Sequence, residues 1–567
     1  MPPRRQPGGG GERPRGAASP RAGRGRGPRP RALRLLPVGD AALSVEFGDA
    51  IDPALNARVR GLDRALRDRP FPGFREAAPT YRSLLVLYDP RASRFAEARE
   101  ALRALADAAP AADLAGRLVT VPTRYGDDDG PDLAEVAHAR GLTEAEAVAA
   151  HSSPEYTAFM LGFMAGFAYL GTVAAALETP RRSTPRLRVP AGSVAIAGRQ
   201  TGIYPVTSPG GWNLIGRTSI ALFDPLADPP SLIQAGDRVR FVPVDELPPP
   251  PAPTALPSAA RPPALEVLEP GLLTTIQDHG RPGWRRAGVS GSGPMDGPAL
   301  RAANLAVGNA AGAAALECTV AGPRLRFLAT TRFALAGGDL SAVLHRDDLG
   351  AWPVPLGAPV LARAGNVLAF GARRSGSRTY VAFAGGIDVP PALGSRSTDL
   401  TAGFGGLGGR ALRGGDLIAL GRPGAGAGHD AAVPAVTVTG QVRVILGPQD
   451  DHFGPEALAA FLGEPYTLAA ESDRVGCRLQ GPRLSHRGLT EIVTDGMVPG
   501  CIQVPPDGQP IVMMAGGPTT GGYPKIATVV SADLPALAQL LPGEGRVRFR
   551  AVSVEEAQEA MRVGSDP

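Results

Sequence analysis

Basic side chains gather near glycine-rich and aromatic turns in the first half of the chain, where their chemistry suits an anion. His151 stands at the end of an expected helix, and Tyr156 follows it closely. Arg124 lies upstream of this pair, and the run Pro180–Arg186 adds guanidinium groups downstream. Guanidinium groups bind carboxylates and phosphates through paired donors, so these residues predict an anion pocket. The alternative, a histidine that caps a helix or fills a core, stays open.

Two glycine-rich segments accompany these residues. Leu161–Val173 reads LGFMAGFAYLGTV and places aromatic side chains among its glycines. Thr207–Thr218 reads TSPGGWNLIGRT and follows the phrase TGIYP. Glycine lets a backbone approach a phosphate closely, but it also forms the tight corners of β-barrels. The sequence therefore leaves two interpretations of these segments open, a phosphate-holding loop and a barrel corner.

Three loops of the second half combine arginine with a carboxylate. They are IQDHGRPGW at Ile276–Trp284, GSRSTD at Gly394–Asp399 and ESDRVGCRL at Glu471–Leu479. Such pairs commonly form structural salt bridges. Their recurrence beside glycine-rich turns also fits a cleft for a carboxylate or a phosphate.

Several enzyme classes are excluded by residue types. The chain has one lysine, Lys525 in the phrase YPKI, so it lacks both a Walker A loop and the lysine of a biotin carrier. The phrase GFGGLG at Gly403–Gly408 is followed by a turn and a strand pattern, so it does not predict a dinucleotide site. Cys318, Cys477 and Cys501 are widely spaced and predict buried thiols.

Charge and length set the broad class. A chain of 567 residues predicts two to four domains. Residues 1–34 hold ten arginines and one glutamate, which predicts a disordered basic tail and leaves the rest of the chain slightly acidic. The basic balance therefore does not indicate nucleic-acid binding. No apolar run is long enough to cross a bilayer, so we expect a soluble, cytoplasmic protein without membrane contact.

The chain divides at the proline-rich run Leu247–Pro263. Before it, strand and helix patterns alternate as β-α-β-β-α-β and end in a strand at Arg117–Thr123, which is the order of a ferredoxin-like unit. A capping box at Thr143 and Glu146 predicts a further helix that ends near His151. From Pro185 onward, short β-rich segments between Gly and Pro predict a barrel or sandwich.

One phrase recurs in the two halves. Val189–Pro205 and Val504–Pro524 share V-P, an apolar strand, A-G, T-G and a final Y-P. Each copy is followed by a similar closing strand, at Gly236–Phe241 and Gly543–Phe549. We interpret this repeat as a duplicated β-barrel domain.

The motifs resemble one bacterial family. Phe163–Leu170, Pro180–Arg182, Val189–Ser193 and SPGGWNLIGRT are similar to the B subunit of 5-oxoprolinase, which forms the allophanate hydrolase subunit 1 family. GLLTTIQDHGRPGW, SGPMD, ALECTV, GSRSTD, DRVGCRL, IQVPPDG and TTGGYPKI are similar to the C subunit of the same enzyme, which forms the carboxyltransferase-like allophanate hydrolase subunit 2 family. The matches extend over about residues 36 to 550, which implies a natural fusion of the two proteins.

The resemblance implies an α+β, mainly β architecture, with a ferredoxin-like domain and duplicated cyclophilin-like barrels. The expected boundaries are a tail at 1–34, the ferredoxin-like α/β domain at 35–125, a cyclophilin-like barrel at 126–246, a linker at 247–263, a first β domain of the second half at 264–430, a second barrel at 431–553 and a tail at 554–567.

The resemblance also implies site residues. The catalytic ones are His151 in proton transfer, with Arg186 and Lys525. Substrate and ATP are expected to contact Arg124, Tyr156, Gly166, Phe167, Tyr169, Arg181, Gln200, Tyr204, Trp212, Arg217, Gln277, Asp278, Arg281, Arg396, Asp399, Arg474, Gln503, Thr520 and Tyr523. Three positions depart from the family pattern: Ala165 replaces a usual proline, and a carboxylate near Gly516 and a glutamine near Pro518 are missing.

The implied activity is ATP-dependent opening of 5-oxo-L-proline to L-glutamate, together with the A subunit of 5-oxoprolinase as a separate protein. ATP and Mg²⁺ are the expected cofactors, with no biotin on this chain and no metal ligands assigned. Phosphorylation of the lactam oxygen would create a leaving group and needs positive charge or donors where charge develops. The alternatives are a carboxyltransferase-like component for urea or allophanate-type amides and a protein that regulates a histidine kinase. A homo-oligomer is compatible with each.

Overall fold

The computed structural model describes residues 33–113, 116–252, 261–347, 349–424 and 440–563. Nearly all of the expected basic tail and residues 253–260 of the expected linker lie outside the described residues. The expectation of a tail from residue 554 is wrong, because Val554–Val563 forms helix α8. Among the helices of the described residues, none combines the length and the hydropathy that a membrane crossing requires.

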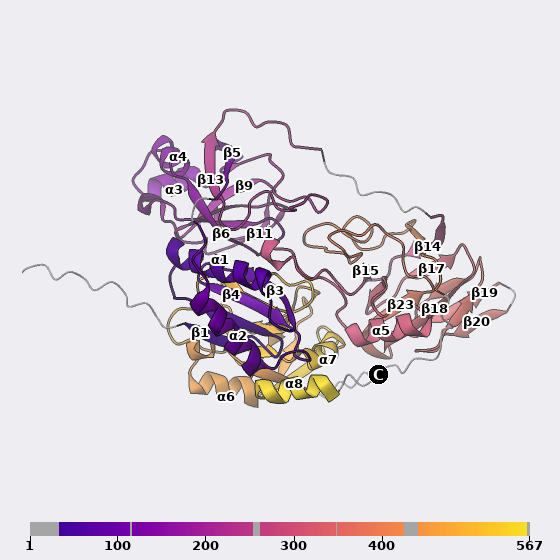
Figure 1. Ribbon diagram of the computed structural model, residues 1–567. Coiled ribbons are helices and arrows are strands. Elements are labelled where there is room, and N and C mark those ends of the chain that lie inside the picture. Colours follow the sequence, from indigo (N-terminus) through magenta and orange to yellow (C-terminus); the bar gives the residue numbers. More distant parts are fainter. Residues whose placement is uncertain (1–32, 114–115, 253–260, 348, 425–439, 564–567) are drawn as a thin grey trace, which may run out of the picture.

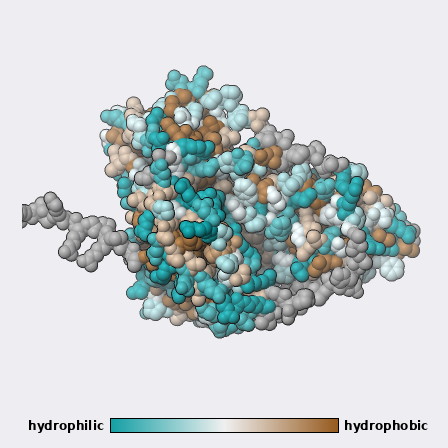
Figure 2. Space-filling view, in the orientation of Figure 1, coloured by the Kyte–Doolittle hydropathy of each residue, from teal (hydrophilic) through white to brown (hydrophobic). Residues whose placement is uncertain are grey.

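The first domain is an antiparallel sheet with two helices on one face (Figure 1). Its strands lie in the order β1-β2-β4-β3, with bounds β1 Arg34–Pro37, β2 Ala42–Glu46, β3 Phe74–Pro79 and β4 Ser83–Tyr88. The helices are α1 Pro53–Asp68 and α2 Phe95–Ala108. Helix α1 begins where the Asp52 carboxylate accepts hydrogen bonds from two backbone N–H groups of the first turn. Figure 2 shows the outer face over these helices as mostly hydrophilic.

The last strand expected in this domain lies elsewhere, and this part of the prediction is wrong. Leu118–Tyr125 forms β5, which pairs with strands of the first barrel and not with the sheet. Strand β1 takes the sheet edge instead, where it pairs antiparallel with β2. The order of elements along the chain matches the prediction, but strand partners depend on long-range contacts that this order does not specify.

Two closed seven-stranded barrels follow, and their topologies are identical, which confirms the duplication. Their strand orders are β10-β7-β6-β13-β5-β12-β9 and β25-β32-β29-β30-β27-β26-β33. Each strand therefore has a counterpart at the same place, and the parallel pair β5–β13 recurs as β25–β33. The first set comprises β6 Tyr156–Leu161, β7 Ala168–Gly171, β9 Ser193–Ala197, β10 Gln200–Ile203, β12 Asn213–Arg217 and β13 Arg238–Pro243. The second comprises β25 Gln441–Leu446, β26 Tyr466–Leu468, β27 Gly476–Gln480, β29 Cys501–Gln503, β30 Ile511–Met513, β32 Lys525–Val529 and β33 Arg546–Ala551.

The topology corrects the register of the repeated phrase. Each barrel carries a small two-stranded sheet, β8 Arg186–Val189 with β11 Ser208–Gly210, and β28 Asp495–Gly496 with β31 Thr520–Gly521. Because β11 and β31 are counterparts, TTGGYP corresponds to SPGGWN and not to TGIYP. Short glycine-rich phrases of similar composition allow more than one alignment, and strand pairing decides between them.

Helices accompany each barrel, and their positions along the chain differ between the two. The first barrel carries α3 Leu133–Ala139 and α4 Glu144–Ser152, and the second carries α6 Pro455–Gly463 and α7 Leu534–Ala538. The capping box that predicted α4 is present, with Thr143 and Glu146 bonded to each other's backbone.

A β-sandwich lies between the barrels in the sequence. Its six-stranded sheet holds β14 Pro263–Glu269, β17 Arg324–Phe327, β19 Val343–Arg346, β20 Gly350–Pro353, β22 Val367–Ala369 and β24 Leu417–Ala419. Its five-stranded sheet holds β15 Leu273–Gln277, β16 Ala315–Thr319, β18 Thr331–Asp339, β21 Val360–Ala362 and β23 Ser375–Phe383. Buried side chains of both sheets form one core, and helix α5 Gly297–Ala306 packs on the outer face of the five-stranded sheet.

The first domain packs against the last barrel, so the two ends of the sequence meet (Figure 1). Strand β4 shows how: Leu84 and Val86 face the helices, while Leu85 packs with Met497 and Cys501 of the second barrel. Alternate residues of a strand point to opposite faces, so one short strand serves two cores. Helix α8 extends this contact through Gln558, whose amide donates to the Asp40 carbonyl and the Tyr88 hydroxyl.

A buried ion pair lies at this interface. Lys525 Nζ is 3.0 Å from Asp495 Oδ2, and both side chains are almost completely buried. Asp495 also accepts hydrogen bonds from Ser83 of β4, at 2.5 Å, and from Gln449, at 3.2 Å. Burial acts to raise the pKa of Asp495, but Lys525 and Arg82 outweigh it and hold the pKa at about 2. The lysine therefore stabilises the junction between the domains.

Asp495→Asn is expected to destabilise the protein by roughly 3–5 kcal/mol at neutral pH, because it leaves the charge of Lys525 buried and unpaired. The pKa of Asp495 is lower in the folded state, so its stabilisation is present above about pH 4 and is lost as the pH falls toward 2. Chemical denaturation of both proteins across this range measures the difference. The exposed Asp107→Asn is the matched control, and a variant as stable as wild type would contradict the assignment.

Candidate functional site

His151 lies inside the first barrel and is completely buried. Its Nδ1 is 2.7 Å from the Tyr125 hydroxyl, and its Nε2 is 2.8 Å from the Thr201 hydroxyl. The Tyr156 hydroxyl donates to the backbone carbonyl of His151, and the Phe241 ring packs beside it. Burial lowers the pKa of His151 to about 3, so the ring is neutral at physiological pH. These contacts join α4, β5 and β10.

The arginines of the first half hold carboxylates of the chain itself. Arg186 forms a bidentate pair with buried Asp132, at 2.7 and 2.9 Å, and Arg182 bonds the same carboxylate at 3.0 Å. Arg124 and Arg217 both approach Asp129, at 3.3 and 3.7 Å. Arg181 lies 3.8 Å from Glu491, across the junction of the barrels. Each of these arginines therefore lies within 4 Å of a carboxylate of the chain itself.

Four aromatic residues predicted as site residues in the first half form one buried cluster. Phe167 contacts Tyr169, Tyr204 and Trp212 edge to face, with ring centroids 4.9, 5.4 and 5.6 Å apart. Gly166 forms the adjoining turn with φ of +80°, and a Cβ there would lie 2.7 Å from Phe223. Gln200, on β10, keeps its side-chain oxygen buried with no hydrogen-bond partner in the described part of the chain. The glycine-rich segments Leu161–Val173 and Thr207–Thr218 are therefore corners of the barrel packed by aromatic rings.

In the second half, two of the three predicted loops, Ile276–Trp284 and Gly394–Asp399, meet in one polar network. Asp278 accepts hydrogen bonds from the hydroxyls of Ser395 and Ser397, at 2.5 and 2.6 Å, and from the backbone N–H of Arg396. Burial acts to raise the pKa of Asp278, but these donors outweigh it and lower the pKa. The Arg396 side chain donates to the Val389 carbonyl at 2.8 Å.

Arg281 crosses this network. Its side chain is completely buried, donates to the Ser292 hydroxyl at 2.8 Å and to the Ser397 carbonyl, and lies 3.9 Å from Asp399. The guanidinium group also sits over the Phe404 ring, 4.6 Å from its centroid. Gln277 donates to Thr275, while its side-chain oxygen has no partner among the described residues.

The remaining predicted residues join the domains. Arg474 of the second barrel pairs with buried Glu317 of the sandwich and donates to the Gly293 carbonyl at 2.5 Å. Thr520 accepts a hydrogen bond from the Phe163 backbone at 2.9 Å, which links the two barrels. Gln503 donates to the Tyr523 carbonyl at 3.3 Å, within the second barrel. The first two contacts fix the position of one domain relative to another.

A cavity of about 350 Å³ opens where these domains meet, and we call it the inter-barrel pocket. Its size lies within the range of small-molecule sites. The first barrel contributes Phe163, Met164, Ala165, Ser208 and Pro209; the second contributes Val475, Arg478, Gly516, Gly517 and Pro518; the segment Gly288 to Ala402 contributes Gly288, Ser290, Asp399, Thr401 and Ala402. A hollow of about 200 Å³ shares Asp399, Thr401, Val475 and Gly516 with it.

Of the residues named from the sequence as site residues, only Asp399 lines this pocket directly. Its carboxylate accepts hydrogen bonds from the backbone of Thr401 and Ala402, at 3.1 and 2.9 Å. The three positions that depart from the family pattern, Ala165, Gly516 and Pro518, all lie on the pocket wall.

Two polar residues of the pocket were missed. Arg478 is exposed, and its guanidinium forms no ion pair or hydrogen bond with any other residue that the structure describes. The Ser208 hydroxyl is buried and likewise has no partner in the described ranges. Both belong to quoted motifs, DRVGCRL and SPGGWNLIGRT, but only the tertiary structure shows that they line the same cavity.

Within the described residues, no group of three or more His, Cys, Asp or Glu side chains is placed to hold a metal ion. The polar groups of the inter-barrel pocket are one guanidinium, one constrained carboxylate and several hydroxyls. This set can bind an anionic small molecule and donate hydrogen bonds to a carbonyl or phosphoryl oxygen.

Family models match both halves of the chain. Residues 33–233 match the carboxyltransferase domain, subdomain C and D, and residues 287–551 match the carboxyltransferase domain, subdomain A and B. The chain is 41% identical over 296 residues to the 5-oxoprolinase C subunit of Escherichia coli (strain K12), covering 52% of this chain and 94% of that protein. It is 42% identical over 220 residues to the 5-oxoprolinase B subunit of Bacillus subtilis (strain 168), covering 37% of this chain and 92% of that protein.

A urea amidolyase of Lachancea kluyveri is 34% identical over 325 residues, which are 53% of this chain but 17% of that protein. Among solved structures, that of TTHA0988 superposes with a TM-score of 0.79 at 38% identity, and the match covers 90% of this chain and 99% of that chain. The B-like and C-like halves therefore occur together in another single chain. The protein belongs to the carboxyltransferase-domain family of 5-oxoprolinase subunits, with a B-like half followed by a C-like half.

Proposed function

We propose that this chain is the fused B–C component of an ATP-dependent 5-oxoprolinase, which activates 5-oxo-L-proline for hydrolysis to L-glutamate together with a separate A subunit. The single observation that carries the proposal is the inter-barrel pocket, because the B-like and the C-like halves both supply its walls. The names of the relatives support the same component.

The pocket suits a small cyclic amide that carries a carboxylate. Arg478 offers a guanidinium without an internal partner among the described residues, and it would pair with the substrate carboxylate. The unpartnered Ser208 hydroxyl would donate to the lactam oxygen or to a phosphoryl oxygen on it. Apolar walls from Phe163, Met164 and Pro518 would contact the ring.

The reaction needs the lactam oxygen to become a leaving group. Transfer of the γ-phosphoryl group of ATP to that oxygen would release ADP, and water would then add to the lactam carbon. The C–N bond would break as the ring nitrogen takes a proton, and a second water would hydrolyse the resulting γ-glutamyl phosphate to glutamate and phosphate. The expected Mg²⁺ would be held mainly by phosphate oxygens and water, since the described residues offer no cluster of ligands.

The three residues first expected to be catalytic are placed in structural roles in this proposal. The side chains of His151, Arg186 and Lys525 all form hydrogen bonds with other residues of the protein. The chemistry is therefore assigned to the inter-barrel pocket and to the separate partner protein.

A second candidate function is a carboxyltransferase-like component acting on a urea or allophanate-type amide. The similarity to urea amidolyase favours it. Such an enzyme would require a biotin carrier on another chain, and a urea substrate would lack the carboxylate that Arg478 is proposed to bind.

The direct test is ATP turnover and glutamate release from 5-oxoproline by the purified chain, with and without its cognate A subunit. Glutamate is expected only when both proteins are present, with one ATP hydrolysed per ring opened. Turnover that responds to urea but not to 5-oxoproline would transfer the assignment to the second candidate.

Arg478→Ala is expected to raise KM for 5-oxoproline about 10- to 100-fold, because it removes a charge-assisted contact to the carboxylate. Arg478→Lys should restore part of the loss. Steady-state kinetics of glutamate release measures both, with the exposed Arg483→Ala as the control. Equal KM values for Arg478→Ala and wild type would contradict this role.

His151→Gln and Arg186→Ala are expected to lower the melting temperature while leaving kcat/KM of the folded protein within about twofold, since their contacts lie in the barrel. Thermal denaturation and kinetics on the same preparations separate the two effects. A variant with unchanged stability and abolished turnover would restore the catalytic assignment.

A further inference from the structure

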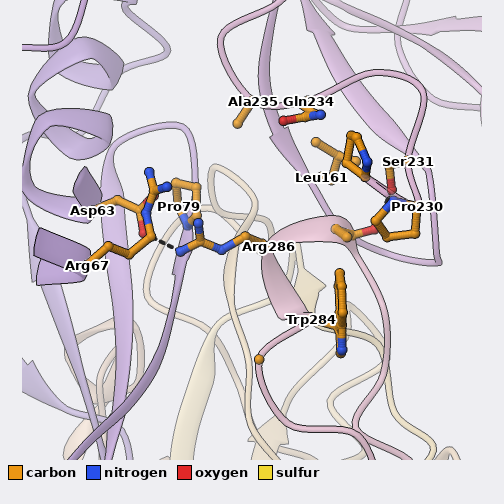
Figure 3. A pocket seen from close by; sticks show the side chains of 13 residues that line it. Asp63, Arg67, Pro79, Leu161, Pro230, Ser231, Gln234, Ala235, Trp284 and Arg286 are labelled. Atoms are coloured by element: carbon orange, nitrogen blue, oxygen red, sulfur yellow. Dashed lines mark hydrogen bonds and ion pairs between the residues drawn. The ribbon is translucent and has the colours of Figure 1, made fainter. Parts of the chain in front are cut away.

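A second cavity has a volume of about 200 Å³, and we call it the α1 cavity (Figure 3). Five parts of the chain line it: Asp63 and Arg67 of α1, Pro79 of β3, Leu161 of β6, the first-barrel loop from Pro229 to Ala235, and the segment Gly283 to Ala287. The two cavities share a wall, because Ala287 lines one and Gly288 lines the other.

The α1 cavity has a charged side and an apolar side. Figure 3 shows Arg67, Asp63 and Arg286 on one side and Trp284 with Pro230 on the other. Asp63 is buried and bonds both guanidinium groups, at 3.2 Å to Arg67 and 2.9 Å to Arg286. The trio keeps one net positive charge, and the shared carboxylate holds both cations at the cavity.

Several donors that line this cavity remain available. The Arg67 and Arg286 side chains are 51% and 32% exposed, so guanidinium N–H groups not bonded to Asp63 can reach a ligand. The Trp284 indole N–H and the Gln234 side-chain amide form no hydrogen bond with the residues that the structure describes. A flat ring can stack on tryptophan, and an amide can bond to the edge of a ring with both donors and acceptors.

Hydrogen bonds from neighbouring elements hold the segment Gly283 to Ala287, which we call the tryptophan segment, in place. Glu76 of β3 accepts hydrogen bonds from the Gly283 backbone at 2.9 Å and from the Arg285 side chain at 3.2 Å. The Ala287 carbonyl accepts from the Gly166 backbone at 3.1 Å and from the Ser231 hydroxyl at 3.3 Å. A rigid wall lowers the entropy cost of ordering the site around a ligand.

We propose that the α1 cavity binds a purine nucleotide, with the base against Trp284 and Pro230 on the apolar side and the phosphates at Arg67 and Arg286. The volume is below the roughly 300 Å³ of a complete small-molecule pocket, so it suits one ring system. The phosphates then lie at the mouth, where the exposed guanidinium groups can bind them bidentately.

The identity of the nucleotide as ATP rests on the proposed function, whereas the site itself rests on its own geometry. Because the Gly166 backbone donates to Ala287, a ligand that stabilises the segment Gly283 to Ala287 also stabilises the turn beside Met164 and Ala165 in the inter-barrel pocket. Binding in the two cavities is therefore expected to be coupled.

The test is the affinity of the full-length chain for MgATP, measured by calorimetry and by tryptophan fluorescence, without 5-oxoproline or a partner. Trp284→Ala and Arg286→Ala should each weaken binding at least tenfold, and Trp284→Phe should recover part of it. The exposed Trp352→Ala and Arg301→Ala are matched controls and should bind like wild type. Melting curves confirm that each variant folds.

Adenosine and inorganic triphosphate separate the two ends of the ligand. Both should bind more weakly than ATP if ring and phosphates contact the cavity together. Triphosphate as tight as ATP would reduce the cavity to an anion site and overturn the proposal, as would wild-type ATP affinity in both variants, or no ATP binding at all. Nucleotide binding without 5-oxoproline turnover would support this site and refute the proposed reaction. Turnover together with unchanged ATP affinity in the variants would support the proposed reaction and refute this site.

Discussion

The structure depends on charged groups that are buried where domains meet. Glu317 with Arg474 joins the sandwich to the second barrel, and Glu76 with Arg285 joins the first domain to the second half. Asp495 is paired with Lys525 within the second barrel and accepts a hydrogen bond from Ser83 of the first domain. Burial acts to raise the pKa of Glu317, but Arg474 and Arg378 outweigh it and hold the pKa below its usual value. A buried charge without its partner is costly, so the two pairs that span domains penalise any other arrangement of those domains.

This constraint explains why the two halves form one structural unit. The first domain precedes the first barrel in the sequence, yet its sheet packs on the last barrel. The inter-barrel pocket then lies between elements that are hundreds of residues apart, such as Ser208 and Gly517. Neither half alone encloses the pocket. The covalent link between the halves gives each half a high effective concentration for the other, which favours assembly of the pocket.

The duplicated barrel has been used in two ways. In the first barrel the interior holds a neutral histidine and aromatic rings, whereas the second barrel has a buried ion pair between β28 and β32. The corners outside the barrels, at β11 and β31, are the parts that reach the neighbouring domain and the pocket. The two barrels thus share one strand topology, and their corners make different contacts with neighbouring parts of the chain.

The sequence by itself determined the local elements and the family. The Thr143–Glu146 capping box, the apolar spacing of α1 and the repeated glycine phrases all depend on residues close in the chain, and the structure confirms the helices and the duplication. Tertiary structure alone decided which arginines are free. Arg186 and Arg478 look alike in sequence, but Asp132 neutralises the first and no described residue pairs with the second. That difference arises from long-range packing, because a side chain's partners depend on which strands become neighbours and not on the residues beside it.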